Sequence, residues 1–329
     1  MKHPLTTTFI LILLFLISQL VGVFVIYSYI GSLSDNGEVE YSDLPFDQQR
    51  PEVENKSTSF LYIIIPVLIG TLILLGIIKF KLYKVWKIWF FLAIWMTLLI
   101  SFATFLNEWI ALLLAILLAS WRILKPNVII HNLTEIFVYA GIAAVFVPIL
   151  NIFASSILLI LISVYDYWAV FKSKHMVTLA KASTEAKIFP GLHVGYDKNK
   201  FGENNDINKI NNISNITQTN KTNKIQHTKV SNKVSNLKNK IGNKKTLSHS
   251  AILGGGDIAF ALLFTGTALI SFYNPSNLTL TFAKTLIIIL FSTIGVSTIL
   301  LLGKKGRFYP AMPFVTLGCF IGYGIALLV

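Results

Sequence analysis

Nine apolar segments run through this chain of 329 residues, and each is long enough, or nearly so, to cross a lipid bilayer as a helix. A segment inside the bilayer must satisfy its backbone polar groups internally, so these runs predict an all-α bundle. A mean hydropathy of +0.67 with 13% charged residues agrees with a polytopic membrane protein and excludes a soluble domain. The nine expected spans are residues 8–30, 60–78, 88–106, 109–124, 129–149, 151–171, 251–271, 279–302 and 309–328.

The segments between the spans differ in charge. Basic residues collect before the first span and after spans two, four, six and eight. The opposite loops hold few basic residues, and the loop 31–59 carries seven acidic ones. Because lysine and arginine favour the cytoplasmic side of a membrane, we predict a multi-pass cell-membrane protein with a cytoplasmic N-terminus and the C-terminus outside.

Most of the net charge of +13 lies in residues 172–250, which hold 15 lysines and four acidic residues. Such a loop beside a bilayer is attracted to anionic head groups. It has neither the interleaved aromatic residues nor a motif of nucleic-acid binding, so no nucleic-acid partner is predicted. Residues 197–245 are low in complexity and are expected to be disordered, whereas 174–190 is amphipathic enough for a surface helix. The expected organisation is an N-terminal six-span bundle (1–171), a basic cytoplasmic loop (172–250) and a C-terminal three-span part (251–329).

Two aspartates lie inside expected spans, Asp166 in the sixth and Asp257 in the seventh. A charge within hydrocarbon costs about 3 kcal/mol or more, so such residues indicate a functional site. Each lies six residues from the cytosolic end of its span, which corresponds to a depth of about 9 Å. Two antiparallel neighbouring helices would bring the carboxyl groups level, and we therefore predict one shared site.

Two carboxyl groups held close together cannot both ionise easily, so one retains a proton and the pair titrates as a unit. The ionised member can then take a proton from water while the protonated member polarises a carbonyl group. This chemistry needs no metal and no cofactor. Other readings stay open, because an aspartate in a membrane helix is often a structural partner or part of an ion path. The six scattered histidines and the single cysteine, Cys319, give no metal-binding pattern.

Two backbone features accompany the aspartates. The glycines before Asp257 lack side-chain bulk and weaken a helix, so an extended peptide can approach the acid. The stretch Pro310-Ala311-Met312-Pro313 lacks two backbone donors at the cytosolic start of the last span and blocks a regular first turn. Alone, a glycine run is more often a packing notch or a helix start, and proline is common in a first helical turn. The predicted substrate-binding residues are Gly254, Gly255, Gly256, Pro310, Ala311, Met312 and Pro313.

The last span also carries Gly318-x-x-x-Gly322, followed by Gly324. Small residues at this spacing let two membrane helices approach closely. We predict a structural helix-packing face here.

Taken in order, Tyr165-Asp166, the Gly-x-Gly-Asp motif ending at Asp257, and the Pro-Ala-Met-Pro stretch resemble the presenilin and signal peptide peptidase family of intramembrane aspartyl proteases. The chain is most similar to the archaeal presenilin homologues. The resemblance implies a nine-helix fold with Asp166 and Asp257 as the catalytic pair and Tyr165 in support. It also implies that residues 310–313 lie beside the active site. Met312 and Gly255 stand where many members of the family have leucine.

The resulting prediction is an intramembrane-cleaving aspartic endopeptidase, a hydrolase acting on single-span transmembrane substrates. The predicted orientation matches that of presenilins, which favours substrates with an outside N-terminus. Nothing in the sequence requires partner subunits. The alternatives are a proton- or cation-coupled transporter or channel that uses the same aspartates, and a catalytically idle scaffold that binds membrane helices.

Overall fold

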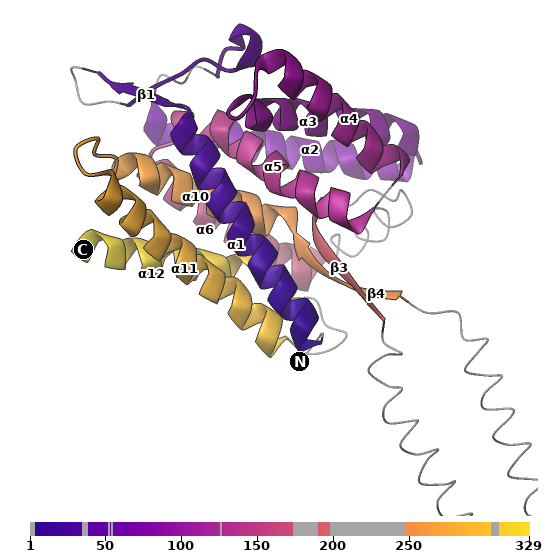
Figure 1. Ribbon diagram of the computed structural model, residues 1–329. Coiled ribbons are helices and arrows are strands. Elements are labelled where there is room, and N and C mark those ends of the chain that lie inside the picture. Colours follow the sequence, from indigo (N-terminus) through magenta and orange to yellow (C-terminus); the bar gives the residue numbers. More distant parts are fainter. Residues whose placement is uncertain are drawn as a thin grey trace, which may run out of the picture. The chain divides into compact units, whose positions relative to one another are not determined.

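The computed structural model describes residues 4–34, 39–51, 53, 55–125, 127–173, 190–197, 248–303 and 309–329 (Figure 1). Within these ranges most residues lie in nine α-helices. The helices are α1 (Leu5–Ser28), α2 (Leu61–Lys79), α3 (Tyr83–Ala103), α4 (Glu108–Leu124), α5 (Val128–Phe146), α6 (Ile152–Trp168), α10 (Gly255–Ser271), α11 (Leu278–Leu302) and α12 (Met312–Leu328).

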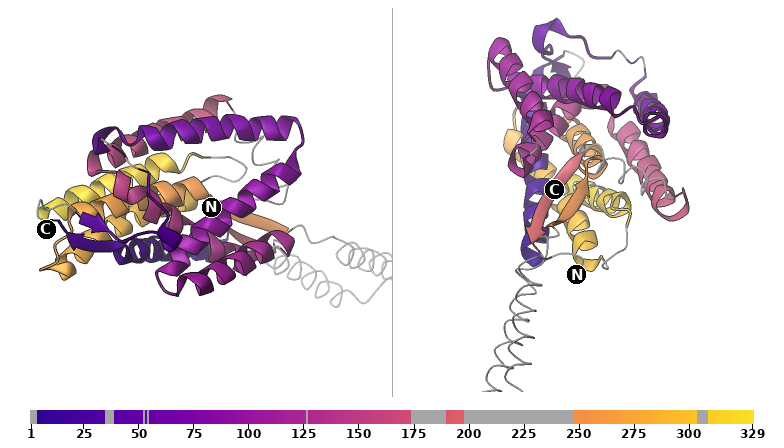
Figure 2. Two further views of the ribbon diagram at one scale, coloured as in Figure 1. Left: turned by 90° about the horizontal axis from the view of Figure 1, so that it is seen from above. Right: turned by 90° about the vertical axis from the view of Figure 1, so that its right-hand side faces the viewer.

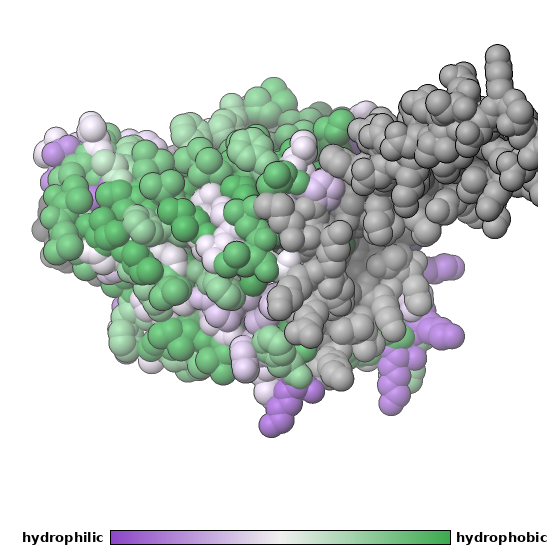
Figure 3. All heavy atoms as spheres, turned by 90° about the horizontal axis from the view of Figure 1, so that it is seen from below, coloured by the Kyte–Doolittle hydropathy of each residue, from purple (hydrophilic) through white to green (hydrophobic). Residues whose placement is uncertain are grey.

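The apolar composition that predicted the spans also explains the surface. In the described part of the chain, six helices are long and apolar enough to cross a membrane, and α10 and α12 are shorter apolar helices. Leucine, isoleucine, phenylalanine and tryptophan side chains are exposed along the outer faces of the helices. Figure 3 shows hydrophobic residues over much of the described surface seen from below. These faces suit contact with lipid, and the predicted all-α polytopic fold is confirmed.

Helix α10 lies at the centre of the helical packing. It contacts α1, α5, α6, α11 and α12 (Figures 1 and 2). Its residues from Ala261 to Leu269 are all buried. The helix that bears Asp257 is therefore held on several sides, while α2 packs against α3 at the edge of the bundle.

Two short sheets accompany the helices. Strand β1 (Ile30–Leu33) pairs antiparallel with β2 (Val39–Tyr41) after α1. Strand β3 (Gly191–Asp197) pairs with β4 (Ser248–Gly254), which runs directly into α10.

The expected start of the seventh span at residue 251 is therefore wrong. Residues 251–254 are the end of β4, and the helix begins at Gly255. The run is apolar because Ala251 and Leu253 are buried in the strand. Strand pairing with a segment that lies far away in the sequence overrides the local helical pattern. Smaller differences affect other spans; the third helix, for example, begins at Tyr83 instead of residue 88.

The chain divides into two units, Met1–His193 with Ile252–Val329, and Val194–Ala251, and most residues of the second unit lie outside the described ranges. The predicted surface helix 174–190 lies, except for its last residue, outside the described residues, as does nearly all of the predicted disordered segment 197–245.

Glycines set the close approach of α11 and α12. A Cβ atom on Gly318 would lie 2.9 Å from the carbonyl carbon of Phe291, and one on Gly322 would lie 2.8 Å from Cα of Ile288. The predicted helix-packing face thus exists at these two positions. Gly324 does not belong to it, because nothing lies within 4 Å of a Cβ atom there.

We expect Gly318→Ala to destabilise the fold by about 1–3 kcal/mol, because the added methyl group meets backbone that cannot move aside. Gly324→Ala is the matched control and should not lower stability. Unfolding of the purified protein in detergent measures both. Equal stability of the two variants would contradict the packing described here.

Candidate active site

Asp166 lies in the last turn of α6. Asn151 caps the start of the helix, because its side chain accepts a hydrogen bond of 2.7 Å from the backbone N–H of Ala154. Asp166 is 8% exposed, and Tyr165 beside it is half-buried. After Trp168 the chain continues in a π-helical turn, Ala169–Ser173. Such turns recur at functional sites, and this one follows the acid directly.

Asp257 lies in the first turn of α10. Gly254 precedes the helix with extended backbone (φ −62°, ψ 143°). The Asp257 carboxyl group bonds to the backbone of Gly254, so the third residue of the helix reaches back to satisfy a terminal N–H group. The side chain of Asp257 is partly exposed, and Gly256 is exposed. The glycine run is thus a helix start that leaves one side of the acid open.

The structure brings the two aspartates together. Helices α6 and α10 pack against each other, and the carboxyl groups of Asp166 and Asp257 interact electrostatically. The sequence argument placed Asp257 six residues inside a helix, and that premise was wrong because α10 starts two residues before it. The conclusion of a shared site agrees with the geometry.

The Pro-Ala-Met-Pro stretch lies beside Asp166. The backbone N–H of Met312 donates a hydrogen bond of 3.3 Å to Asp166 Oδ2, and the backbone of Ala311 also bonds to this carboxyl group. Pro310 and Met312 are buried, and Pro313 is half-buried in the first turn of α12. One turn away, Ser163 of α6 and Thr316 of α12 share a hydrogen bond of 2.6 Å. The irregular start of α12 therefore supplies donors to one of the two acids.

Two further side-chain contacts fix the helices that carry the aspartates. Thr267 of α10 donates to Ser155 Oγ of α6 at 2.8 Å. Gln19 of α1 is fully buried, and its Nε2 donates to the carbonyl oxygen of Ile258 at 3.1 Å. That carbonyl belongs to the residue after Asp257, so α1 holds α10 close to the acid.

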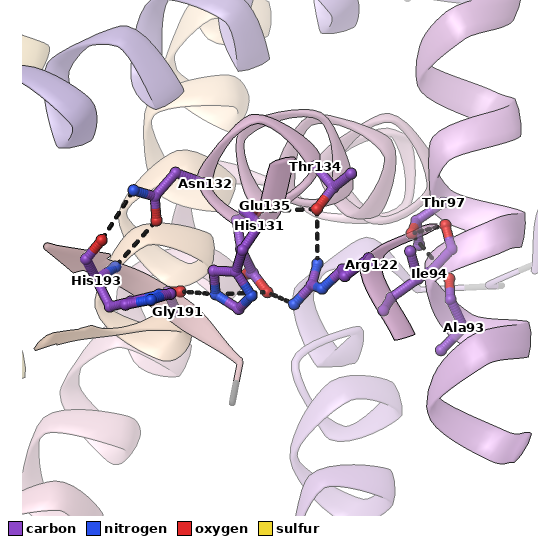
Figure 4. A network of polar contacts seen from close by, with 10 residues as sticks. All are labelled: Ala93, Ile94, Thr97, Arg122, His131, Asn132, Thr134, Glu135, Gly191 and His193. Carbon is purple, nitrogen blue, oxygen red and sulfur yellow. Dashed lines mark hydrogen bonds and ion pairs between the residues drawn. The ribbon is translucent and has the colours of Figure 1, made fainter. Parts of the chain in front are cut away.

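Sequence reasoning missed a buried ion pair near the site. Arg122 of α4 and Glu135 of α5 pair with each other and are 5% and 2% exposed (Figure 4). Arg122 also donates to Thr134 Oγ1 at 3.1 Å. Glu135 is an ionisable residue within the expected span 129–149. The rule that singled out the two aspartates would have found it too.

The start of β3 is attached to α5 by the same group of polar residues. Asn132 donates to the carbonyl oxygen of His193 at 2.8 Å and accepts from its N–H at 3.0 Å. His131 Nε2 donates to the Gly191 carbonyl oxygen at 2.7 Å, as Figure 4 shows. Burial lowers the pKa of the His193 imidazole, and the charge of Arg122 lowers it further. The His193 ring is therefore neutral at pH 7.

Within the described residues, no group of three or more histidine, cysteine, aspartate or glutamate side chains is placed to hold a metal ion. The chemistry that the described residues offer at this site is that of two carboxyl groups, backbone donors and an open glycine edge.

Comparisons with known proteins agree with this geometry. Residues 21–329 match the family described as signal-peptide peptidase, presenilin aspartyl protease. A solved structure of a presenilin family intramembrane aspartate protease in space group C222 has a TM-score of 0.58 at 15% identity, covering 98% of each chain. A second, in space group P2, has a TM-score of 0.54 at 15% identity, covering 97% of this chain and 96% of the other. No curated protein matches the chain.

Proposed function

The chain belongs to the signal-peptide peptidase, presenilin aspartyl protease family, and on that premise we propose that Asp166 and Asp257 are its catalytic pair. The observation that carries this assignment is the packing of α6 against α10, which brings the two carboxyl groups close enough to interact electrostatically. The family consists of intramembrane aspartyl proteases, and it gives no support to the transporter alternative.

The proposed reaction is hydrolysis of a peptide bond by one water molecule. The ionised aspartate takes a proton from water, and the resulting nucleophile adds to the scissile carbonyl carbon. The protonated aspartate donates its proton to the carbonyl oxygen. The tetrahedral intermediate, a geminal diol, then breaks its C–N bond as the aspartic acid that took the water proton gives it to the amide nitrogen and the other aspartate takes a proton from a diol hydroxyl. The products are a carboxyl and an amino terminus, and the pair returns to its singly protonated state.

Backbone contacts hold the two acids in place for this reaction. The N–H of Met312 holds Asp166, and the backbone of Gly254 holds Asp257. Fixed donors of this kind orient a carboxylate without reorganisation during the reaction. Tyr165, which adjoins Asp166 on α6, has a supporting role in this proposal.

The proposed substrate is a single-span transmembrane protein that unwinds locally and binds in extended form. The proposed binding residues are Gly254, Gly255 and Gly256 beside Asp257 and Pro310–Pro313 beside Asp166; Gly256 is exposed and Gly254 partly exposed, whereas Gly255 is buried against Tyr139. In this proposal the backbone groups of the two stretches pair with the extended strand. Because a helix in lipid hides its backbone, unwinding is the main barrier in this scheme.

We extend the proposal to topology and organisation. The charge distribution supports a cytoplasmic N-terminus, an outside C-terminus and attraction of the basic loop 172–250 to anionic lipid. In the proposed division into parts 1–171, 172–250 and 251–329, the first and third each contribute one aspartate. Nothing in the sequence requires a partner subunit.

The purified protein in liposomes tests this function with a single-span substrate. We expect cleavage that a transition-state inhibitor of aspartyl proteases blocks, and that a chelator and a serine protease inhibitor leave unchanged. Cleavage that the chelator abolishes would contradict the two-aspartate mechanism. Proton flux without cleavage, lost when either aspartate is replaced, would favour the transporter alternative.

A further inference from the structure

Helix α5 carries a buried polar face that the proposed reaction does not use. Asn132, Glu135 and Tyr139 are spaced so that they lie along one side of the helix, and they are 8%, 2% and 4% exposed. Polar side chains at such depth are costly unless they are paired or serve a function. The N-terminal member, Asn132, holds β3 as described above, and Tyr139 lies furthest towards the aspartates.

The Glu135 carboxylate on this face is fixed by its ion pair with Arg122. The Arg122 guanidinium lies 5.2 Å from the ring centre of Phe90, so it is held on a second side. Glu135 interacts with Arg122, with Tyr139 and with the backbone of Gly191. The Tyr139 hydroxyl and Glu135 Oε2 are both buried and make no hydrogen bond of ordinary length and angle, so Tyr139 is held by its packing and by its electrostatic interaction with Glu135.

Tyr139 fills the space beside Gly255. A Cβ atom on Gly255 would lie 3.2 Å from Cζ and 3.3 Å from Cε1 of Tyr139, and closer still to its hydroxyl oxygen. Tyr139 also interacts electrostatically with Asp257, two residues further on. The tyrosine thus occupies the volume that a side chain at position 255 would take.

The need for such a contact follows from the glycines. Gly254, Gly255 and Gly256 have no side chains to restrict their backbone, so the turn that carries Asp257 is intrinsically loose. The Tyr139 hydroxyl, which is the atom nearest to position 255, limits the movement of this turn together with the ring that carries it. A displacement of about 1 Å at a reacting group can cost about 100-fold in rate.

We infer that Tyr139 is a positioning residue for Asp257, acting through its contact with Gly255 at the start of α10. This inference rests on the proposed catalytic role of Asp257. It also explains why a glycine stands at position 255: the tyrosine leaves room for nothing larger.

A double-mutant cycle tests the inference with Tyr139→Phe, Gly255→Ala and the two combined. Tyr139→Phe removes only the hydroxyl group, and we expect kcat to fall about tenfold with KM and the unfolding temperature unchanged. Gly255→Ala should lower kcat about 100-fold, because the new methyl group displaces the turn. In the combined variant, the clash between the new methyl group and the Tyr139 hydroxyl is gone. Its kcat should therefore be about tenfold higher than that of Gly255→Ala alone.

The control is Gly324→Ala, which adds the same methyl group where nothing lies within 4 Å and should keep wild-type kinetics. Tyr139→Phe with wild-type kcat would overturn the inference, even if Gly255→Ala fails to fold. Purely additive effects of the two changes would overturn it as well. The same assay includes Asp257→Asn: if that variant remains active, the proposed function itself fails, and with it the inference. An inactive Asp257→Asn variant beside an unaffected Tyr139→Phe variant would leave the proposed function standing.

Discussion

Asp257→Asn is expected to lower the rate of peptide-bond cleavage by about 10⁴-fold, the upper end of what acid–base catalysis contributes. Asparagine has the size of aspartate but can neither take nor give the proton that the reaction moves. Asp166→Asn should have a similar effect, because the two acids act as one pair. The variant with both changes should be no worse than either alone, since groups that act as a unit are not additive.

Product formation in liposomes measures these rates for equal amounts of folded protein. Asp43→Asn is the matched control, because Asp43 is exposed in the loop after β2 and lies outside the proposed site. It should cleave at the wild-type rate. An Asp166→Asn or Asp257→Asn variant that retains a tenth or more of wild-type activity would contradict the assignment of the pair.

Removing one member of the Arg122–Glu135 pair should have the largest effect on stability. Glu135→Ala leaves the Arg122 charge buried without its carboxylate partner, and such a change costs about 3–5 kcal/mol. Arg122→Ala likewise leaves the Glu135 carboxylate buried without its guanidinium partner. Replacing both residues together, with Arg122→Met and Glu135→Leu, should cost less than either single change, because no buried charge then remains.

Denaturant or thermal unfolding of the purified protein measures this series. Lys84→Ala removes an exposed charge from α3 and should change stability by less than about 0.5 kcal/mol. If the Glu135→Ala protein is as stable as the Lys84→Ala protein, the Arg122–Glu135 pair does not contribute to stability as its burial predicts. If the double replacement is worse than both single changes, the pair contributes more than charge neutralisation.

The helical layout could be predicted because it depends on local composition. A stretch of about 20 apolar residues is helical in a bilayer whatever its neighbours are. The two aspartates could be singled out because burying a charge in a membrane is costly. The Gly318–Gly322 packing face could be predicted because both residues are small. Each of these signals lies within one segment of the chain.

The features that sequence reasoning missed depend on contacts between distant segments. The end of strand β4 has the composition of a membrane span, and only its pairing with β3 makes it a strand. The contact of Tyr139 with Gly255 joins residues on two helices, and neither residue indicates it alone. Glu135 is different, because its place in an apolar segment was visible, although its partner Arg122 was not.

The most direct measurement is the mass-spectrometric identification of both products that the purified protein releases from a single-span substrate in liposomes. We expect a complementary pair whose new termini lie inside the apolar span, formed by the wild-type protein and absent with Asp166→Asn. Products cut only in the flanking soluble segments, or the same pair formed by the Asp166→Asn protein, would contradict intramembrane cleavage by the two aspartates.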